Sequence, residues 1–253
     1  MDDNLYEVVD LENDNSFSVT LNLYRDEFSP IIFDQNLYLI AGYNLSNNWL
    51  IDTSVIETNS LVESVATLMG LPSERYNHQC LNNGANLICA GGSEGINYLN
   101  EIVRIDLIDK TNLVTTTLNS HKEDFSLLPL SNNRILITGG IGYAGYLNEV
   151  EIVDLNDGTS TLLGNGLVKE RAKHRSVLVD TNLVLISGGL GLTQTSFTAE
   201  LLDLTTGEST ILPWRLKVPR VGHTATLLPD GRVLIAGGSA TDRRMEVWNP
   251  RSN

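Results

Sequence analysis

The sequence predicts an all-β fold, a β-propeller of four-stranded antiparallel blades, and two repeating patterns carry this prediction. The first is a glycine pair that recurs along nearly all of the 253 residues. Its copies are Gly42-Tyr43, a degenerate form, then Gly91-Gly92, Gly139-Gly140, Gly188-Gly189 and Gly237-Gly238. The first members are separated by 49, 48, 49 and 49 residues. A period near 50, in which each glycine closes a short apolar run, is typical of propellers.

The second pattern is a set of short strand-like runs joined by turn residues. In the C-terminal repeat, residues 223–228 are β-branched or apolar, Pro229-Asp230-Gly231 has turn chemistry, and residues 232–236 form another apolar run. The same hairpin recurs over residues 28–41, 78–90, 125–138 and 174–187. In all but the last copy two further strands follow. Four strands per repeat, without a helix-period segment, predict meanders that stack radially.

We interpret the chain as a single domain, residues 1–253, because no linker or low-complexity segment interrupts the pattern. The repeats cover about 22–70, 71–119, 120–167, 168–216 and 217–253. Residues 1–21 look like the third and fourth strands of a blade, and the last repeat ends after a third strand. We expect five blades, with the N-terminal strand closing the ring, although one third-strand segment is then redundant. The alternative is an arc cut from a larger ring, which would expose apolar blade faces.

The net charge of −14 argues against nucleic acid and anionic membranes as partners. The N-terminus resembles no secretory signal, and no apolar run is as long as a membrane helix, so we expect a cytoplasmic monomer. Cys80 and Cys89 flank one predicted hairpin turn and could lie opposite each other. In a reducing compartment we expect two reduced, largely buried thiols.

Residues 220–238, RVGHTATLLPDGRVLIAGG, resemble the bacterial form of the kelch repeat. The resemblance extends over about five repeats and is closest in the first two strands of each. It implies a kelch-type β-propeller whose inter-blade loops, with the loops after each glycine pair, surround the central channel and bind ligands. The Tyr and Trp usual in the third and fourth kelch strands are mostly replaced by Ile, Leu or Val.

A basic residue stands three positions before the His or Phe of each first strand. These bases are Arg25, Arg75, Lys122, Arg171 and Arg220. Propeller symmetry would place them as a ring at the inter-blade loops, where guanidinium forks suit carboxylates or phosphates. An acid stands at or near the start of each third strand: Asp52, Glu101, Glu149, Glu200 and Glu246. Base and acid could therefore pair and tie the blades together instead of binding a ligand.

A second series lies three residues before those acids. Its members are Trp49, Tyr98, Tyr146, Phe197 and, breaking the aromatic run, Arg243. Beside a cationic ring these side chains would form a mixed apolar and charged recognition surface. Alternatively, the aromatic rings cap the blade core. Tyr143 adds one aromatic to its loop outside the series.

Three histidines, His78, His174 and His223, share one repeat position, and three His can hold zinc. Because the position recurs with the repeat, we interpret them as structural and expect no metal and no cofactor. The sequence contains no nucleophile elbow, HExxH, P-loop or dinucleotide fingerprint, which argues against an enzyme.

The function predicted is a non-catalytic protein-interaction module. It would bind an acidic peptide or protein loop on the face formed by the inter-blade loops, through the basic and aromatic series. One alternative is an enzyme or binder acting on a small anionic carbohydrate at the channel mouth, as some kelch-like proteins do. Another is a structural part of a longer protein. A pocket holding an acid with a shifted pKa would favour the enzyme, and an open face would favour a protein partner.

Overall fold

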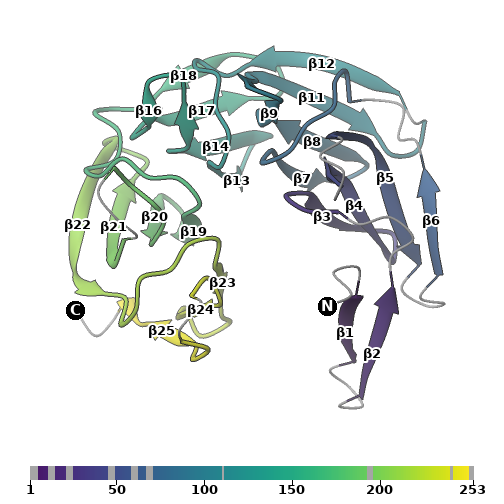
Figure 1. Ribbon diagram of the computed structural model, residues 1–253. Coiled ribbons are helices and arrows are strands. Elements are labelled where there is room, and N and C mark those ends of the chain that lie inside the picture. Colours follow the sequence, from purple (N-terminus) through teal and green to yellow (C-terminus); the bar gives the residue numbers. More distant parts are fainter. Residues whose placement is uncertain are drawn as a thin grey trace. The chain divides into compact units, whose positions relative to one another are not determined.

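The computed structural model describes residues 5–10, 15–20, 25–44, 49–57, 62–66, 71–109, 111–192, 196–239 and 242–250. These residues form β-strands joined by turns and loops (Figure 1). No helix in these ranges is long and apolar enough to cross a membrane. The chain divides into two compact units: unit 1 comprises residues 1–97 and 103–114, and unit 2 comprises residues 98–102 and 115–253.

Unit 1 contains the first blade and most of the second. The first blade is the antiparallel sheet β3 (Ser29–Phe33), β4 (Asn36–Tyr43), β5 (Trp49–Glu57) and β6 (Val62–Ala66). The second is β7 (Gln79–Asn83), β8 (Asn86–Ala90), β11 (Glu101–Asp106) and β12 (Asn112–Thr117). Between β8 and β11, β9 (Ser93–Glu94) and β10 (Asn97–Tyr98) form a small hairpin.

Unit 2 contains the remaining blades. The third is β13 (Ser126–Leu130), β14 (Arg134–Thr138), β17 (Val150–Asp154) and β18 (Ser160–Leu162), with the hairpin β15 (Ile141–Gly142) and β16 (Gly145–Tyr146) between its second and third strands. The fourth is β19 (Arg175–Asp180), β20 (Leu183–Ser187), β21 (Thr198–Asp203) and β22 (Glu208–Arg215). The fifth sheet consists of β23 (Thr224–Leu227), β24 (Val233–Ala236) and β25 (Glu246–Trp248). The predicted four-strand meander is therefore the observed blade.

The second strand of each complete blade carries the core. In β8, β14 and β20 the last four residues are all buried, which is why these strands read as continuous apolar runs and not as alternating ones. One cluster in unit 2 joins Leu136 and Val150 of the third blade to Val184, Ile186 and Leu202 of the fourth. The first strands of neighbouring blades lie side by side within each unit: β3 with β7, β13 with β19, and β19 with β23. Apolar burial between blades is the main driving force for stacking them.

The N-terminal strands β1 (Leu5–Asp10) and β2 (Asn15–Thr20) pair with each other in antiparallel register, as the third and fourth strands of a blade do. The sheet of the fifth repeat has three strands among the described residues. The closing role expected for residues 1–21 therefore stays a prediction.

The glycine pair has a conformational role, and its first copy lies one residue earlier than the sequence suggested. Ala41 and Gly42 have φ of 52° and 96°, which match 53° and 97° at Gly91 and Gly92. The first copy is thus Ala41-Gly42 and not Gly42-Tyr43. The second member needs glycine because its backbone passes close to the entry segment of its own blade. A Cβ added to Gly42 would lie 2.5 Å from the Asp26 oxygen.

Replacing Gly189 by Ala should therefore destabilise the fold more than the same change at Gly231. Both have positive φ, 97° and 84°. A Cβ at Gly189 would lie 2.7 Å from the Ala172 oxygen, whereas a Cβ at Gly231 meets nothing within 4 Å. We expect Gly231→Ala to lower the free energy of unfolding by about 1 kcal/mol. Gly189→Ala should lower it by about 2 kcal/mol more, because of overpacking. Urea unfolding of both variants measures this, and equal losses would contradict the crowding argument.

Candidate functional site

The five bases lie inside their blades and not on a surface. Each is at most 2% exposed: Arg25, Arg75, Lys122, Arg171 and Arg220. Arg171 shows the arrangement. Its Nη2 donates to Glu200 Oε1 at 2.5 Å and to Thr198 Oγ1 at 3.1 Å, and its Nη1 donates to the Gly188 carbonyl at 2.7 Å. One guanidinium thus links the glycine pair of its blade to the third strand.

The same pairing recurs in other blades. Base–acid distances are 2.6 Å for Arg25–Asp52, 2.6 Å for Lys122–Glu149 and 2.9 Å for Arg220–Glu246. The arginines also donate to the first member of the glycine pair, namely to the carbonyls of Ala41, Gly91, Gly188 and Gly237. Of the two roles left open by the sequence, pairing within the blade is the one with observed contacts. Ligand contact through these side chains stays a prediction, and their burial does not favour it.

The backbone of the same residue reaches the preceding blade. The carbonyl of Arg171 accepts from Gly140 N at 2.8 Å, and that of Arg220 accepts from Gly189 N at 2.8 Å. In unit 1, the Arg75 carbonyl accepts from Gly42 N at 2.9 Å. Each of these arginines therefore binds two blades, one through its side chain and one through its main chain.

A buried glutamate in the third strand completes the contact. Glu151, Glu200 and Glu246 pair across from isoleucines of the second strand and accept hydrogen bonds from the chain entering their blade. The backbone donors are Asn119 N at 2.7 Å, Val168 N at 2.7 Å and Lys217 N at 2.6 Å, respectively. Glu151 was missed from sequence because Glu149, two residues earlier on the same strand face, also matches the spacing. Lys122 contacts both carboxylates, Glu149 at 2.6 Å and Glu151 at 3.3 Å.

Of these acids, Glu149 is held ionised. Burial alone would raise the pKa of Glu149, but hydrogen bonds from Lys122 and Ser120 outweigh it and hold the pKa below its ordinary value. Burial lowers the pKa of Arg171, opposed by the charge of Glu200. A carboxylate kept charged by a buried base is a poor proton donor, so this network fits a structural role and not general acid catalysis.

The aromatic series lies on the loops and hairpins that follow the glycine pairs. Tyr98 ends β10 and Tyr146 ends β16, while Phe197 and Arg243 lie on exposed loops. Trp49 begins β5, and its side chain lies outside the described residues. Capping of the blade core does not account for Phe197, which is 39% exposed.

Tyr143, which falls outside the series, contacts Tyr98 of the series in unit 2. It is 67% exposed on the turn between β15 and β16. Its ring meets the Tyr98 ring edge-on with centroids 5.0 Å apart, and the centroid of the His121 ring lies 6.0 Å from that of Tyr143. Sequence spacing missed this residue because the contact joins loops of two successive repeats. The three rings form a partly exposed cluster, called below the Tyr143 cluster.

The charges on the loops of unit 2 are unequally exposed. Lys173 and Asp124 lie 3.6 Å apart, with side chains 33% and 14% exposed. Arg244 and Asp242 lie 2.6 Å apart, with side chains 80% and 12% exposed. In both pairs the cation faces solvent more than the acid does.

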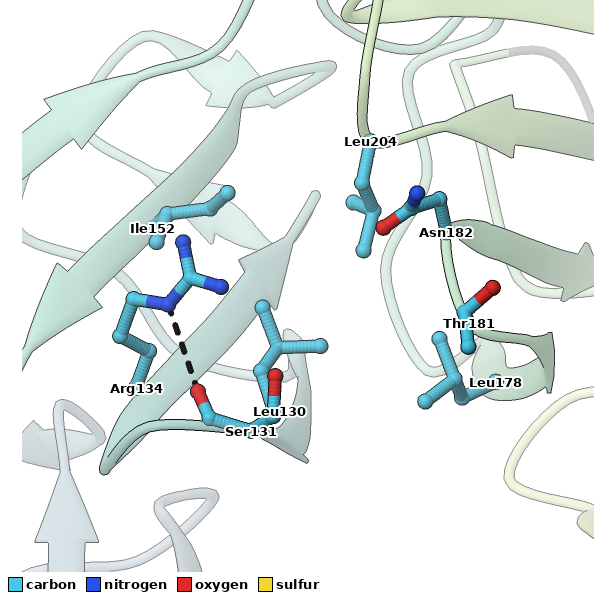
Figure 2. A pocket seen from close by; sticks show the side chains of 8 residues that line it. All are labelled: Leu130, Ser131, Arg134, Ile152, Leu178, Thr181, Asn182 and Leu204. Atoms are coloured by element: carbon cyan, nitrogen blue, oxygen red, sulfur yellow. Dashed lines mark hydrogen bonds between the residues drawn. The ribbon is translucent and has the colours of Figure 1, made fainter.

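A pocket of about 220 Å³ lies between the third and fourth blades, at the end of the sheets away from the entry segments (Figure 2). Leu130, Ile152, Leu178 and Leu204 line it with the polar turn residues, and Arg134 donates to the Ser131 carbonyl at 3.3 Å. Arg134 is the one ionisable side chain among its eight lining residues. The pocket contains no acid, so it does not supply the feature that would favour a carbohydrate enzyme.

Two of the repeated histidines are hydrogen-bonded core residues. His174 Nε2 lies 2.8 Å from Thr138 Oγ1, and His223 Nε2 lies 2.9 Å from Ser187 Oγ. Each hydroxyl belongs to the residue just before a glycine pair of the preceding blade. Both rings also pack against those glycines, since a Cβ on Gly139 or Gly188 would lie 2.7 Å from the ring. These contacts agree with the structural interpretation of His174 and His223.

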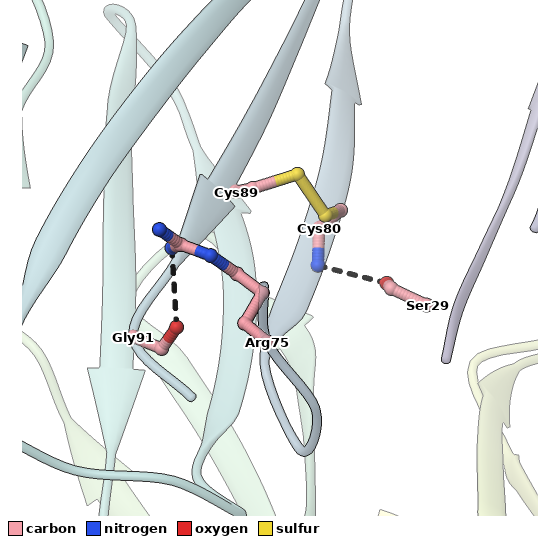
Figure 3. Close-up of a disulfide and its surroundings, with 5 residues drawn as sticks. All are labelled: Ser29, Arg75, Cys80, Cys89 and Gly91. Carbon is pink, nitrogen blue, oxygen red and sulfur yellow. Dashed lines mark hydrogen bonds between the residues drawn. A yellow bond between two sulfur atoms is a disulfide. The ribbon is translucent and has the colours of Figure 1, made fainter. Parts of the chain in front are cut away.

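The expectation of two reduced cysteines is wrong. Cys80 and Cys89 are directly opposite each other in the β7–β8 ladder and form a disulfide (Figure 3). Their Cα atoms are 4.1 Å apart, so the pairing of the strands alone brings the sulfur atoms together. The hairpin predicted from the sequence correctly places the two residues opposite each other, but strand pairing does not determine their redox state, which the assumption of a reducing compartment predicts wrongly.

Four-stranded blades that are tied together at glycine pairs within each unit are typical of a β-propeller. The chain matches the model of the KLHDC2/KLHL20/DRC7 Kelch-repeats domain over residues 27–238. It belongs to this family, and the predicted kelch-type β-propeller is confirmed. Kelch propeller domains are generally protein-interaction modules. A comparison with curated proteins finds no match for the chain.

Removing one buried base should destabilise the fold strongly. Arg171→Met leaves Glu200 buried without its cation, and we expect a loss of about 3–5 kcal/mol in the free energy of unfolding. Arg232→Met removes a cation from the exposed pair with Asp230, where both side chains are about half exposed, and should change little. Chemical denaturation compares the two. Similar stabilities for the two variants would contradict the structural role of the base.

Stability should also fall at mildly acidic pH because buried histidines resist protonation. Burial, followed by the charges of Arg175 and Arg220, lowers the pKa of His223 to about 4. In the unfolded chain the pKa is about 6.5. Between these values the unfolded state binds more protons, so stability decreases as pH falls from 6.5 towards 4. At pH 5 this histidine should cost about 2 kcal/mol.

Urea unfolding at pH 7.5, 6 and 5 tests this expectation. The control is His223→Phe, because Phe125 occupies the same repeat position in the third blade. The variant should show a smaller loss between pH 7.5 and 5 than the parent. Identical pH profiles for parent and variant would mean that His223 does not carry the effect.

Proposed function

We propose that the chain is a protein-interaction module that binds an acidic segment carrying an apolar side chain. The recognition face would be formed in unit 2 by the segments that enter each blade and the loops that follow each glycine pair. The observation that carries the proposal is the exposed Tyr143 cluster, on a set of loops in which Lys173 and Arg244 are more exposed than the acids they pair with. Aromatic and arginine side chains are those most enriched at binding hot spots.

The buried bases have a different part in this proposal from the one the spacing suggested. Arg171 and Arg220 hold the entry segments in place and do not contact the partner. The partner would instead meet side chains exposed on the same loops, chiefly Tyr143, Phe197, Arg243 and Arg244. Exposed cations steer an acidic partner and set its orientation more than its affinity, whereas the aromatic rings supply most of the contact energy.

A displayed library of peptides that vary in net charge tests the charge preference. Retained peptides should be acidic, and their affinity should fall as salt is raised, because the interaction between exposed charges is screened. Retention of neutral or basic peptides, or affinity that is insensitive to salt, would contradict an acidic partner.

The position of the face is tested with charge reversal. Arg243→Glu combined with Arg244→Glu should weaken binding of a retained peptide at least about tenfold. Arg232→Glu, on the turn between β23 and β24, makes the same charge change at the other end of the sheet and should leave affinity unchanged. Tyr143→Ala tests the aromatic part and should also weaken binding about tenfold or more. Equal effects of the loop and control variants would place the binding site elsewhere.

A further inference from the structure

His78 differs from its repeat counterparts in having no hydrogen-bond partner. It is 1% exposed, and neither ring nitrogen has a partner among the described residues. At His174 and His223 the partner is a hydroxyl just before the glycine pair of the preceding blade. The residue at that place before His78 is Ile40, whose alkyl side chain offers no acceptor. Burial of an imidazole without a hydrogen-bond partner costs free energy of folding, because the ring nitrogens lose their hydrogen bonds to water.

Two sulfur atoms lie close to the His78 ring. One ring nitrogen of His78 and the Sγ atoms of Cys80 and Cys89 all lie within 4.8 Å of one another. The equivalents of Cys80 and Cys89 in the third blade are Leu127 and Ile137, which are also directly opposite each other. The second blade thus has two cysteines where the third blade has an apolar cross-strand pair. They lie beside His78, the histidine that has no hydroxyl partner.

We propose that the reduced form of this cluster binds a soft cation of the zinc class through His78, Cys80 and Cys89, and that the Cys80–Cys89 disulfide closes the site. An imidazole and two thiolates are soft ligands that suit Zn²⁺. Two ligands at zinc bond lengths of about 2.0–2.3 Å are at most about 4.6 Å apart, so opening of the disulfide needs only small side-chain movements to fit the ion.

The β-ladder prepares the site for the metal. Cys80 and Cys89 are held opposite each other by the β7–β8 ladder, which does not depend on the disulfide. Cys80 N also donates to Ser29 Oγ of the first blade at 2.9 Å, which fixes the strand against its neighbour (Figure 3). Cys89 is fully buried, whereas Cys80 is partly exposed. The edge at Cys80 is therefore where a reductant, an ion and a water ligand can reach the cluster.

The redox step balances with a dithiol as reductant. Two electrons and two protons pass to the Cys80–Cys89 bond, which becomes two thiols, while the dithiol becomes a disulfide. Binding of Zn²⁺ then releases both thiol protons, and neutral His78 contributes a nitrogen lone pair. Two thiolates cancel the charge of the ion. The guanidinium of Arg75, whose charge acts on His78, therefore faces a neutral complex.

The experiment measures zinc in the whole chain in two redox states. Protein reduced with dithiothreitol and desalted without oxygen is mixed with Zn²⁺ and desalted again, beside untreated protein. Metal content is then measured by elemental analysis, and affinity by competition with a chelating dye. We expect one zinc ion per reduced chain and none on the oxidised chain. Bound zinc should also protect both thiols from alkylation.

Variants locate the site. Cys80→Ser and His78→Phe should each reduce zinc affinity of the reduced chain at least about tenfold. His78→Phe makes a residue that the first and third blades carry at this position, Phe28 and Phe125, so the fold should accept it. The matched control is His223→Phe, the same change at the same repeat position away from any cysteine, and it should bind zinc like the parent.

Three results would overturn the proposal. They are no zinc on the reduced chain, equal zinc on both redox forms, and unchanged affinity in both Cys80→Ser and His78→Phe after circular dichroism shows that these variants are folded.

Discussion

The buried base at the entry of each blade is the interaction on which the rest of the molecule depends. A guanidinium suits this position because its planar fork has five donors, enough to reach a carbonyl, a hydroxyl and a carboxylate together. Arg171 uses them on Gly188, Thr198 and Glu200, while its own carbonyl accepts from Gly140 of the preceding blade. Removal of such a charge from water is costly, and the contact is favourable because nearly every donor is satisfied.

Several other features follow from this contact. The positive φ of the glycine pair turns its carbonyl and N–H towards the base, and the absence of a Cβ lets the next entry strand pass within van der Waals distance. The buried glutamate then holds the entry segment by its backbone N–H groups, as Glu200 does with Val168 and Lys169. Loops fixed in this way can present exposed side chains such as Tyr143 in a stable arrangement. Preorganised loops on a rigid scaffold are suited to recognition, because little conformational entropy is lost on binding.

The second blade shows how one repeat can depart from its neighbours without losing the fold. Its third strand has Val103 two residues after Glu101, where the third blade has the buried Glu151 after Glu149. Its histidine lacks the hydroxyl found at His174 and His223, and its first two strands carry a disulfide. Because the apolar packing and the strand ladders are retained, the positions of His78, Cys80 and Cys89 can carry residues with another chemical role without loss of the fold.

The blades, their order and the turn positions could be read from the sequence, because strand burial and turn chemistry are local properties that recur with each repeat. The pairing of Arg25, Lys122, Arg171 and Arg220 with acids was foreseen as one of two roles. Burial of these bases favours pairing with the acids over contact with a ligand, and burial depends on how the blades pack. The spacing assigned the first glycine pair one residue too late, because only φ distinguishes Ala41-Gly42 from Gly42-Tyr43.

What only the tertiary structure decided concerns contacts between repeats. Tyr143 meets Tyr98 and His121 from a different loop, and the disulfide depends on the register of two strands. His78 has no hydrogen-bond partner because the preceding blade has Ile40 where later blades have a hydroxyl residue. The strands and turns within a repeat are determined by its own sequence. Contacts between neighbouring repeats join side chains some 50 residues apart, and a single sequence does not show which of these side chains meet.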